Sequence, residues 1–378
     1  MCAVSGKSTL SSIEGILIEA KCPDACTMTT YDLEKGMRLQ VEAKVEEEGR
    51  YIINANKFYQ TIKVMEGEEV TLIVDDKLMA TMISGKSSHK MNALAGSDFP
   101  ELPNLRSELG FSLRQKSFRE MIGKTMFAMA VNDQRMVFNG SFIKIADGGV
   151  TVIASDTYKL AKCELKTAVE NNNTDGEYLH YQFIVPVRTV NELYKLLASD
   201  GDEKVRIYMM RRHMVYIIGK LTFFTRLIEG EYIDYDRIIV KNHKAVMYVD
   251  KREMIAALER AALITDEKIA GSVRSPVKLE LSGNLLKITA VSSAGTTYDE
   301  LAVEHEGDDV TISFNNRYLM DTVRACEGDE VKISLNSPLT PIILEPTGYE
   351  NEVDENGEDK KDEEKEDLFV LLPVRTKD

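Results

Sequence analysis

The stretch Phe138–Leu165, FNGSFIKIADGGVTVIASDTYKLAKCEL, decides how the rest of this 378-residue chain is interpreted. Two runs rich in β-branched and aromatic residues flank Asp147-Gly148-Gly149. Glycine adopts the positive φ angles of a tight turn at little cost, so the pattern predicts a β-hairpin. Weak copies of the same piece occur on both sides of it, which indicates an internal repeat.

The length of the repeat follows from the positions of the helix expected after each hairpin. The apolar face of this helix begins at Phe58, Val190 and Leu319, with offsets of 132 and 129 residues. Another amphipathic helix is expected before the hairpin in the second and third copies, around Phe118 and Met254. The spacing predicts an α+β chain of three similar domains, 1–104, 105–239 and 240–378, of which the first starts without its leading helix.

Composition favours a cytoplasmic protein. The sequence is 43% hydrophobic and has no apolar run near 18 residues, so no transmembrane helix is expected. The first residues lack the basic region and apolar core of a signal peptide. Five cysteines, an odd number spread thinly, are typical of reduced thiols.

The net charge of −15 argues at first against a nucleic-acid partner. However, Glu350–Asp367 alone holds eleven acidic and three basic residues. More than half of the excess therefore lies in one low-complexity segment, which we expect to be a solvated, disordered loop. For DNA binding, the direction in which lysine and arginine side chains point matters more than the total charge.

No motif for chemistry is complete. Ser5–Thr9 resembles the end of a phosphate-binding loop, but Met1 stands where that loop needs its first glycine. Cys22 and Cys26 could form half of a zinc site, yet no second cysteine or histidine pair accompanies them. We therefore expect no cofactor, no metal and no catalytic residues. A binding protein is favoured over the rival interpretation, an ATP-using enzyme built on Ser5–Thr9.

Several short motifs, taken in order, resemble the bacterial sliding clamp, the β subunit of DNA polymerase III. The resemblance covers the chain except its missing start, and these motifs carry it: Asp98-Phe99-Pro100, Asn139-Gly140, Ala154–Ala161, Val185-Pro186, Leu227–Gly230 with Asp234-Tyr235, and Leu372–Arg375.

The resemblance implies three like domains per chain. Two chains would close head to tail into a ring, with helices inside and sheets outside. Such a ring would encircle double-stranded DNA without sequence preference and tether the replicative polymerase, with the clamp loader and other clamp-motif proteins as further partners. The DNA-facing candidates are Lys57, Lys63, Arg119, Lys124, Arg188, Lys195, Lys251, Arg252, Arg317 and Arg324.

The resemblance also implies a hydrophobic pocket for short client peptides. Its wall would consist of Phe138, Ser155, Thr157, Tyr158, Lys159, Leu160, Ile233, Ile238, Val370, Leu371, Leu372, Pro373, Val374 and Arg375. Two residues depart from the family pattern, since Ile233 stands where proline is common and Thr157 where glycine is common. These changes are expected to reshape the rim of the pocket.

The match places the subunit interface at His89 and Met91 of one chain, against Leu263 and Ile264 of the other. The alternative to a ring is a scaffold that binds peptides without encircling DNA. Retention on circular DNA that is lost when the DNA is cut would separate the two.

Overall fold

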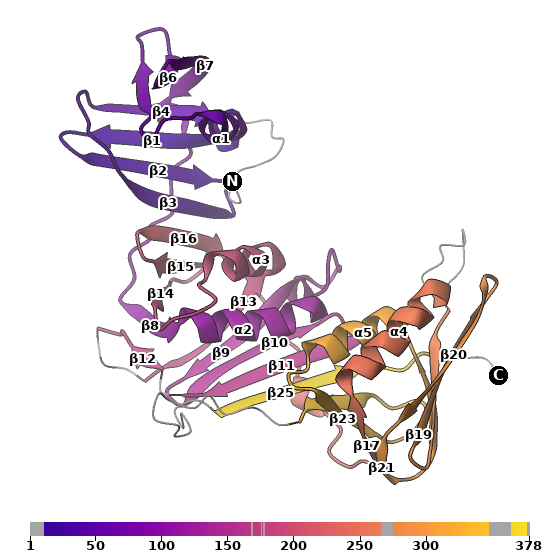
Figure 1. Cartoon of the computed structure of the whole chain (residues 1–378). Helices are drawn as coiled ribbons and strands as arrows, with labels where there is room; N and C mark the ends of the chain where they lie inside the picture. Colours follow the sequence, from indigo (N-terminus) through magenta and orange to yellow (C-terminus); the bar gives the residue numbers. More distant parts are fainter. Residues whose placement is uncertain are drawn as a thin grey trace, which may run out of the picture. The chain divides into compact units, whose positions relative to one another are not determined.

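The computed structural model describes residues 11–167, 169–174, 176, 178–265, 275–347 and 364–375. The chain forms two compact units (Figure 1). Unit 1 comprises Met1–Lys116, Glu170–Glu177 and Lys195–Leu227, and unit 2 the remaining residues. No helix in the described part of the chain is long and apolar enough to cross a membrane.

Unit 1 is built on one antiparallel sheet of twelve strands. From edge to edge these are β12 (Glu170–Asn171), β8 (Leu109–Arg114), β14 (Lys204–Met209), β15 (His213–Ile218), β16 (Leu221–Arg226), β3 (Lys35–Glu42), β2 (Ala25–Tyr31), β1 (Gly15–Lys21), β4 (Gly49–Asn54), β7 (Ser87–Ala95), β6 (Met79–Ser84) and β5 (Thr71–Val74). The sheet crosses the predicted boundary at residue 104, because β16 pairs with β3. Continuous pairing of this kind covers strand edges that would otherwise be open to aggregation.

The helix of unit 1 is α1 (Ala55–Val64). It begins where the spacing predicted, because the Asn54 side chain accepts a hydrogen bond from the Lys57 N–H and caps the first turn. Short 3₁₀ turns, η1 (Ser11–Glu14) and η2 (Gly96–Asp98), lie near the ends of β1 and β7. Leu17, Ile52 and Phe224 form the centre of one of its apolar clusters.

Unit 2 contains two antiparallel sheets. The nine-stranded sheet runs β13 (His180–Pro186), β9 (Gly140–Ala146), β10 (Gly149–Ser155), β11 (Lys159–Lys166), β25 (Glu364–Leu371), β24 (Ile342–Pro346), β23 (Glu330–Leu335), β17 (Ala245–Asp250) and β21 (Glu304–Gly307). The four-stranded sheet runs β20 (Gly295–Ala302), β19 (Leu285–Ser292), β18 (Val277–Ser282) and β22 (Val310–Phe314). The larger sheet crosses the predicted boundary at residue 239, because β11 pairs with β25.

Four further α-helices follow the predicted apolar faces. They are α2 (Gln115–Thr125), α3 (Val187–Leu196), α4 (Lys251–Thr265) and α5 (Asn316–Ala325), and α4 and α5 lie side by side in unit 2 (Figure 1). The unit boundary crosses α2 after Lys116 and α3 after Tyr194. Phe118, Val190 and Leu319 are buried, as amphipathic periodicity requires. The 3₁₀ turns of this part are η3 (Met126–Ala128), η4 (Met136–Asn139) and η5 (Tyr235–Arg237).

The predicted Phe138–Leu165 hairpin is corrected to a three-stranded meander. The turn at Asp147-Gly148 joins β9 to β10 as expected, and Gly149 has a φ of 156°. The second apolar run, however, contains another turn, because Thr157 adopts a φ of 75° and ends β10. Strand β11 then returns antiparallel to β10.

The predicted acidic loop extends four residues too far at its C-terminal end. Glu364–Asp367 belongs to β25, which pairs along the whole length of β11. Two ion pairs hold the charged end of this strand, one from Lys166 of β11 to Glu366 and one from Lys365 to Glu120 of the helix at residues 115–125. The rest of the predicted loop and Ser5–Thr9 lie outside the described residues.

Candidate functional site

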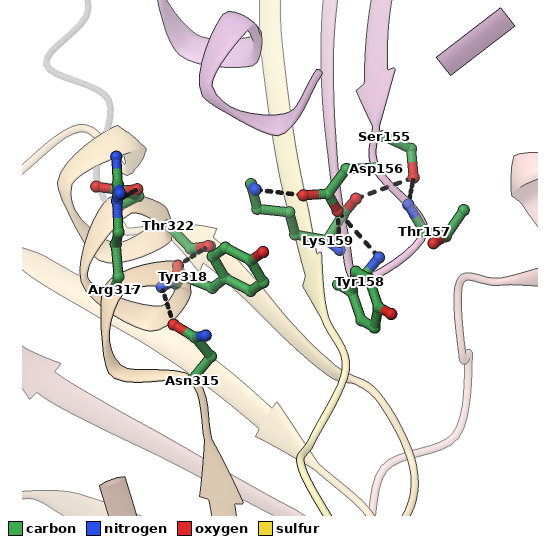
Figure 2. Close-up of polar contacts among 10 residues, drawn as sticks. Ser155, Asp156, Thr157, Tyr158, Lys159, Asn315, Arg317, Tyr318 and Thr322 are labelled. Carbon is green, nitrogen blue, oxygen red and sulfur yellow. Dashed lines mark hydrogen bonds and ion pairs between the residues drawn. The ribbon is translucent and has the colours of Figure 1, made fainter. Parts of the chain in front are cut away.

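The site is centred on the turn between β10 and β11. The Asp156 carboxylate accepts hydrogen bonds from the N–H groups of Tyr158 (3.0 Å) and Lys159 (2.9 Å), and its other oxygen lies 2.5 Å from the Lys159 ammonium. Ser155 Oγ donates to the Lys159 carbonyl at 2.9 Å and accepts from the Thr157 N–H at 3.1 Å. These bonds together hold the backbone of Thr157 in its positive-φ conformation (Figure 2).

Helix α5 supplies the neighbour of this turn. The Lys159 ammonium lies 4.0 Å from the centre of the Tyr318 ring, a cation–π contact, and the rings of Tyr158 and Tyr318 are 6.4 Å apart (Figure 2). Asn315 caps α5 by accepting from the Tyr318 N–H, which fixes the first turn of the helix. Lys159 is 6% exposed, so water hardly reaches its ammonium. The Asp156 carboxylate and the Tyr318 ring are the two partners that hold it.

The end of β25 is bonded to the same turn. The Leu372 N–H donates to the Tyr158 carbonyl at 2.9 Å, and the Val374 N–H donates to the Ser313 carbonyl at 2.8 Å. The first bond continues the pairing of β25 with β11 beyond Leu371, and the second ties the chain to β22 of the four-stranded sheet. Leu372, Pro373 and Val374 are half-buried and Arg375 is exposed.

An apolar cluster lies below this surface. Its buried centre includes Leu160 and Val370, and the partly buried Ile233 and Ile238 pack against it. The Tyr232 ring stacks on Phe142 with centroids 5.0 Å apart, and burial raises the pKa of Tyr232. The segment around residues 232–239 therefore covers the cluster with partly exposed apolar side chains.

The predicted pocket residues divide into two groups. Phe138, Ser155, Leu160, Val370 and Leu371 are at most 3% exposed, so they form the core beneath the surface. A peptide that docked here would touch the remaining side chains. These are Thr157, Tyr158, Ile233, Ile238, Leu372, Pro373, Val374 and Arg375, with Lys159 buried between the two groups.

Sequence reasoning missed Tyr318 and Tyr232. Both rings lie against predicted residues, Tyr318 beside Lys159 and Tyr232 beside Phe138. The Asn315 cap places Tyr318 on the first turn of α5. No sequence pattern, however, indicated which strand that turn faces.

The predicted DNA-facing residues differ in their exposure and in their partners. Lys57, Lys63 and Arg188 are exposed, and no ion pair is found for them among the described side chains. Lys195 is exposed as well, and Arg252, Arg317 and Arg324 are exposed but lie near Asp329, Asp321 and Glu259. Arg119 donates to the Tyr194 carbonyl, and the Lys251 ammonium donates to the Cys326 carbonyl, so each already serves a structural bond.

Lys124 does not belong in the DNA-facing set. Its side chain is 8% exposed, and its ammonium lies 2.6 Å from Asp367 and 2.9 Å from Glu327. Burial lowers the pKa of Lys124, but the charge of Asp367 and the hydrogen bonds from Lys124 to Asp367 and Glu327 together raise it by more, so the net shift is upward. Burial raises the pKa of the neighbouring Cys163 thiol as well. Lys124 is therefore a buried structural charge.

The predicted interface residues lie in different units. In unit 1, His89 and Met91 of β7 line a cavity of about 550 Å³ together with Lys57, Gln60, Thr61, Met79, Lys90 and Asn92. In unit 2, Leu263 near the end of α4 is 78% exposed and Ile264 is half-buried. Each residue therefore lies at a surface of its own unit.

The short-spaced cysteines occupy a simple hairpin. Cys22 is exposed in the turn after β1, whereas Cys26 is buried on β2 opposite Ala20. Burial raises the pKa of the Cys26 thiol, which keeps it protonated at neutral pH. The segment between the two cysteines is the turn that joins β1 to β2.

Family models match the chain in three consecutive segments. The N-terminal domain of the DNA polymerase III beta subunit matches residues 1–103, its central domain residues 112–234, and its C-terminal domain residues 236–355.

Individual relatives agree with this assignment. A beta sliding clamp from Halalkalibacterium halodurans is 28% identical over 376 residues, which cover 99% of this chain and 92% of the relative. The crystal structure of the Bacillus subtilis DNA polymerase sliding clamp has a TM-score of 0.86 at 22% identity, covering 100% of this chain and 95% of that one. A Pseudomonas aeruginosa sliding clamp bound to griselimycin has a TM-score of 0.83 at 25% identity, covering 99% and 94%.

The three domain models follow one another in their proper order and together account for most of the sequence. The chain therefore belongs to the family of the DNA polymerase III beta subunit, the bacterial sliding clamps.

Proposed function

We propose that this chain acts as a DNA sliding clamp, which encircles duplex DNA and keeps a polymerase and other clients on it. The observation that carries the proposal is the ordered match to all three domains of the DNA polymerase III beta subunit. In this role the chain tethers and its client performs the catalysis, so we assign no catalytic residue. The domain boundaries 104/105 and 239/240 remain part of the proposal.

The DNA contact would be electrostatic and independent of sequence. The exposed cations Lys57, Lys63 and Arg188 support it, because each is available for a phosphate. A topological link predicts slow loss from closed circular DNA and rapid loss once the DNA is cut. Equal loss from both forms would instead favour a peptide-binding scaffold that does not encircle DNA.

Ring closure would bring unit 1 of one copy against unit 2 of another, head to tail. The cavity at His89 and Met91 offers a recess on one side, and Leu263 offers an exposed apolar side chain on the other. A head-to-tail contact whose rotation closes gives a finite assembly. Two copies with helices inside and sheets outside would form the proposed ring.

The oligomeric state tests this interface. Sedimentation equilibrium is expected to give a dimer for the parent chain and a monomer for Leu263→Asp, which would bury a charge in the interface. Val131→Asp is the control, because Val131 is exposed to nearly the same degree, 75% against 78%, and lies outside the proposed contact. A Leu263→Asp variant that stayed dimeric on dilution would contradict the assignment.

Clients would bind the surface above the Leu160–Val370 cluster. Partly buried Ile233, Ile238 and Leu372 provide apolar contacts, and the exposed edge of Tyr158 provides an aromatic one. Such a surface suits an extended peptide with apolar side chains.

A matched tyrosine pair tests the client surface. Tyr158→Ala is expected to weaken binding of a fluorescein-labelled clamp-motif peptide about tenfold, the range of a moderate interface contact. Tyr178→Ala is the control, since Tyr178 is 86% exposed in the same unit and distant in sequence from the turn. Equal affinities of both variants for the peptide would remove the surface from the proposal.

A further inference from the structure

The residue at the centre of the β10–β11 turn has a backbone conformation that is unusual for its residue type. Thr157 has a φ of 75°, a region that glycine enters freely and that is costly for a β-branched side chain. Strained residues of this kind persist where the surroundings fix them, and they cluster at functional sites. Here Ser155 and Asp156 supply the bonds that fix the conformation.

The chain contains a second copy of this turn. In unit 1 the Asp32 carboxylate accepts from the N–H groups of Glu34 (3.1 Å) and Lys35 (2.8 Å), and the Lys35 ammonium lies 3.3 Å from the same side chain. Leu33 takes the place of Thr157 and also has a φ of 75°. The Asp-x-x-Lys turn itself therefore imposes the positive φ in both units, and glycine would be the least strained residue at either position.

The two positions differ in what surrounds them. Thr157 is half-buried next to the proposed client surface, and its neighbour Tyr158 lies beside the Tyr318 ring. In Figure 2 its side chain projects from the turn on the far side of Asp156 from α5. Leu33 is 48% exposed on a turn whose lysine has no aromatic ring in contact among the described residues.

We infer that Thr157 is a specificity-determining residue of the client surface, retained despite its backbone strain because its bulk limits the size of the apolar side chain that a client peptide can place there. The inference rests on the proposed client surface. A threonine carries three more non-hydrogen atoms than glycine, and a pocket commonly discriminates tens of fold on the basis of one or two such groups. Clients with a compact apolar anchor are therefore favoured over clients with a large one.

The test compares two clamp-motif peptides that differ only in this anchor, leucine in one and tryptophan in the other. Fluorescence anisotropy is expected to show a preference of the parent chain for leucine, and Thr157→Gly is expected to reduce that preference about tenfold. Thr157→Val keeps the size and branching of the side chain, so it should keep the preference.

Leu33→Gly controls for strain. It relieves the same φ in unit 1 and should change thermal stability in the same direction as Thr157→Gly, yet leave the peptide preference as it is in the parent chain. An unchanged preference in Thr157→Gly, with both peptides still bound, would overturn the inference. Failure of the parent chain to bind either peptide would instead refute the client surface on which the inference rests.

Discussion

The twelve-stranded and nine-stranded sheets contain the same junction in different surroundings. In unit 1, β16 pairs with β3 so that Thr225 lies opposite Lys35, and in unit 2, β25 pairs with β11 so that Leu371 lies opposite Lys159. The next backbone bond is also shared, from Arg226 N–H to the Glu34 carbonyl and from Leu372 N–H to the Tyr158 carbonyl. The two repeats therefore share the same strand pairing and the same backbone hydrogen bond at this junction.

The junctions differ in how the space beside the turn is filled. Gly36 in unit 1 takes the register position of Leu160 in unit 2, and a Cβ at Gly36 would lie 2.2 Å from the Phe224 ring. Phe224 and Phe99 are both buried, so side chains of unit 1 itself fill the apolar cluster beside its turn. In unit 2 the cover consists of partly exposed side chains such as Ile233. The proposed client surface lies at this second junction.

The charges at the two junctions differ as well. Lys220 and Glu42 form an ion pair in unit 1 with both side chains mostly exposed, whereas Lys124 and Asp367 in unit 2 are 8% and 0% exposed. A pair in water contributes little, while a buried pair is costly to break, since the remaining charge has no solvent. The two turns share one backbone conformation, and the residues packed around each turn make the two junctions different.

The largest expected effect comes from breaking the buried pair. Lys124→Met removes the ammonium and leaves Asp367 and Glu327 unneutralised, which should lower the free energy of unfolding by about 3–5 kcal/mol. Lys220→Met should cost under about 1 kcal/mol. Urea denaturation measures both, with hydrogen exchange to assign the loss to its unit.

A second substitution checks the cause. Lys124→Met combined with Asp367→Asn should recover part of the lost stability, because the buried carboxylate is then neutral. If Lys124→Met and Lys220→Met cost the same, burial does not distinguish the two junctions.

Removing the turn aspartates should give equal losses of stability but unequal losses of function. Asp156→Ala and Asp32→Ala each remove the carboxylate that accepts from two backbone N–H groups, and each leaves a nearly buried lysine without its carboxylate partner, at a cost of about 3 kcal/mol. Only Asp156→Ala should weaken client-peptide binding, measured by fluorescence titration well below the unfolding temperature. Loss of binding in Asp32→Ala would mean that the junctions are functionally coupled.

The smallest expected effect is the contribution of His213, in unit 1, to the pH dependence of stability. Burial lowers the pKa of His213, and the nearby Arg226 and Arg212 lower it further. The folded state therefore binds the proton less readily than the unfolded state, so stability falls as the pH drops below the ordinary histidine pKa near 6.5. His213→Gln should reduce the loss of stability between pH 7 and 5.5, followed by thermal unfolding. An unchanged acid response would exclude His213 as its source.

The sequence by itself determined the elements whose signals are local. Asn54 and Asn315 cap helices by bonding N–H groups three residues away, and the apolar faces at Phe58, Val190 and Leu319 repeat with helical spacing. The turn at Asp147-Gly148 also depends only on adjacent residues. The residues of the proposed client surface, in contrast, came from the family resemblance and not from a local signal.

Only the tertiary structure decided which of these residues reach solvent. Lys124 was expected to face DNA, but Asp367, 243 positions later in the chain, draws it into the core. The acidic stretch was expected to stay in water throughout, but β11 gives its last four residues a strand to pair with. Burial and charge pairing are set by distant residues, and no local pattern records which side chain a strand or helix will meet.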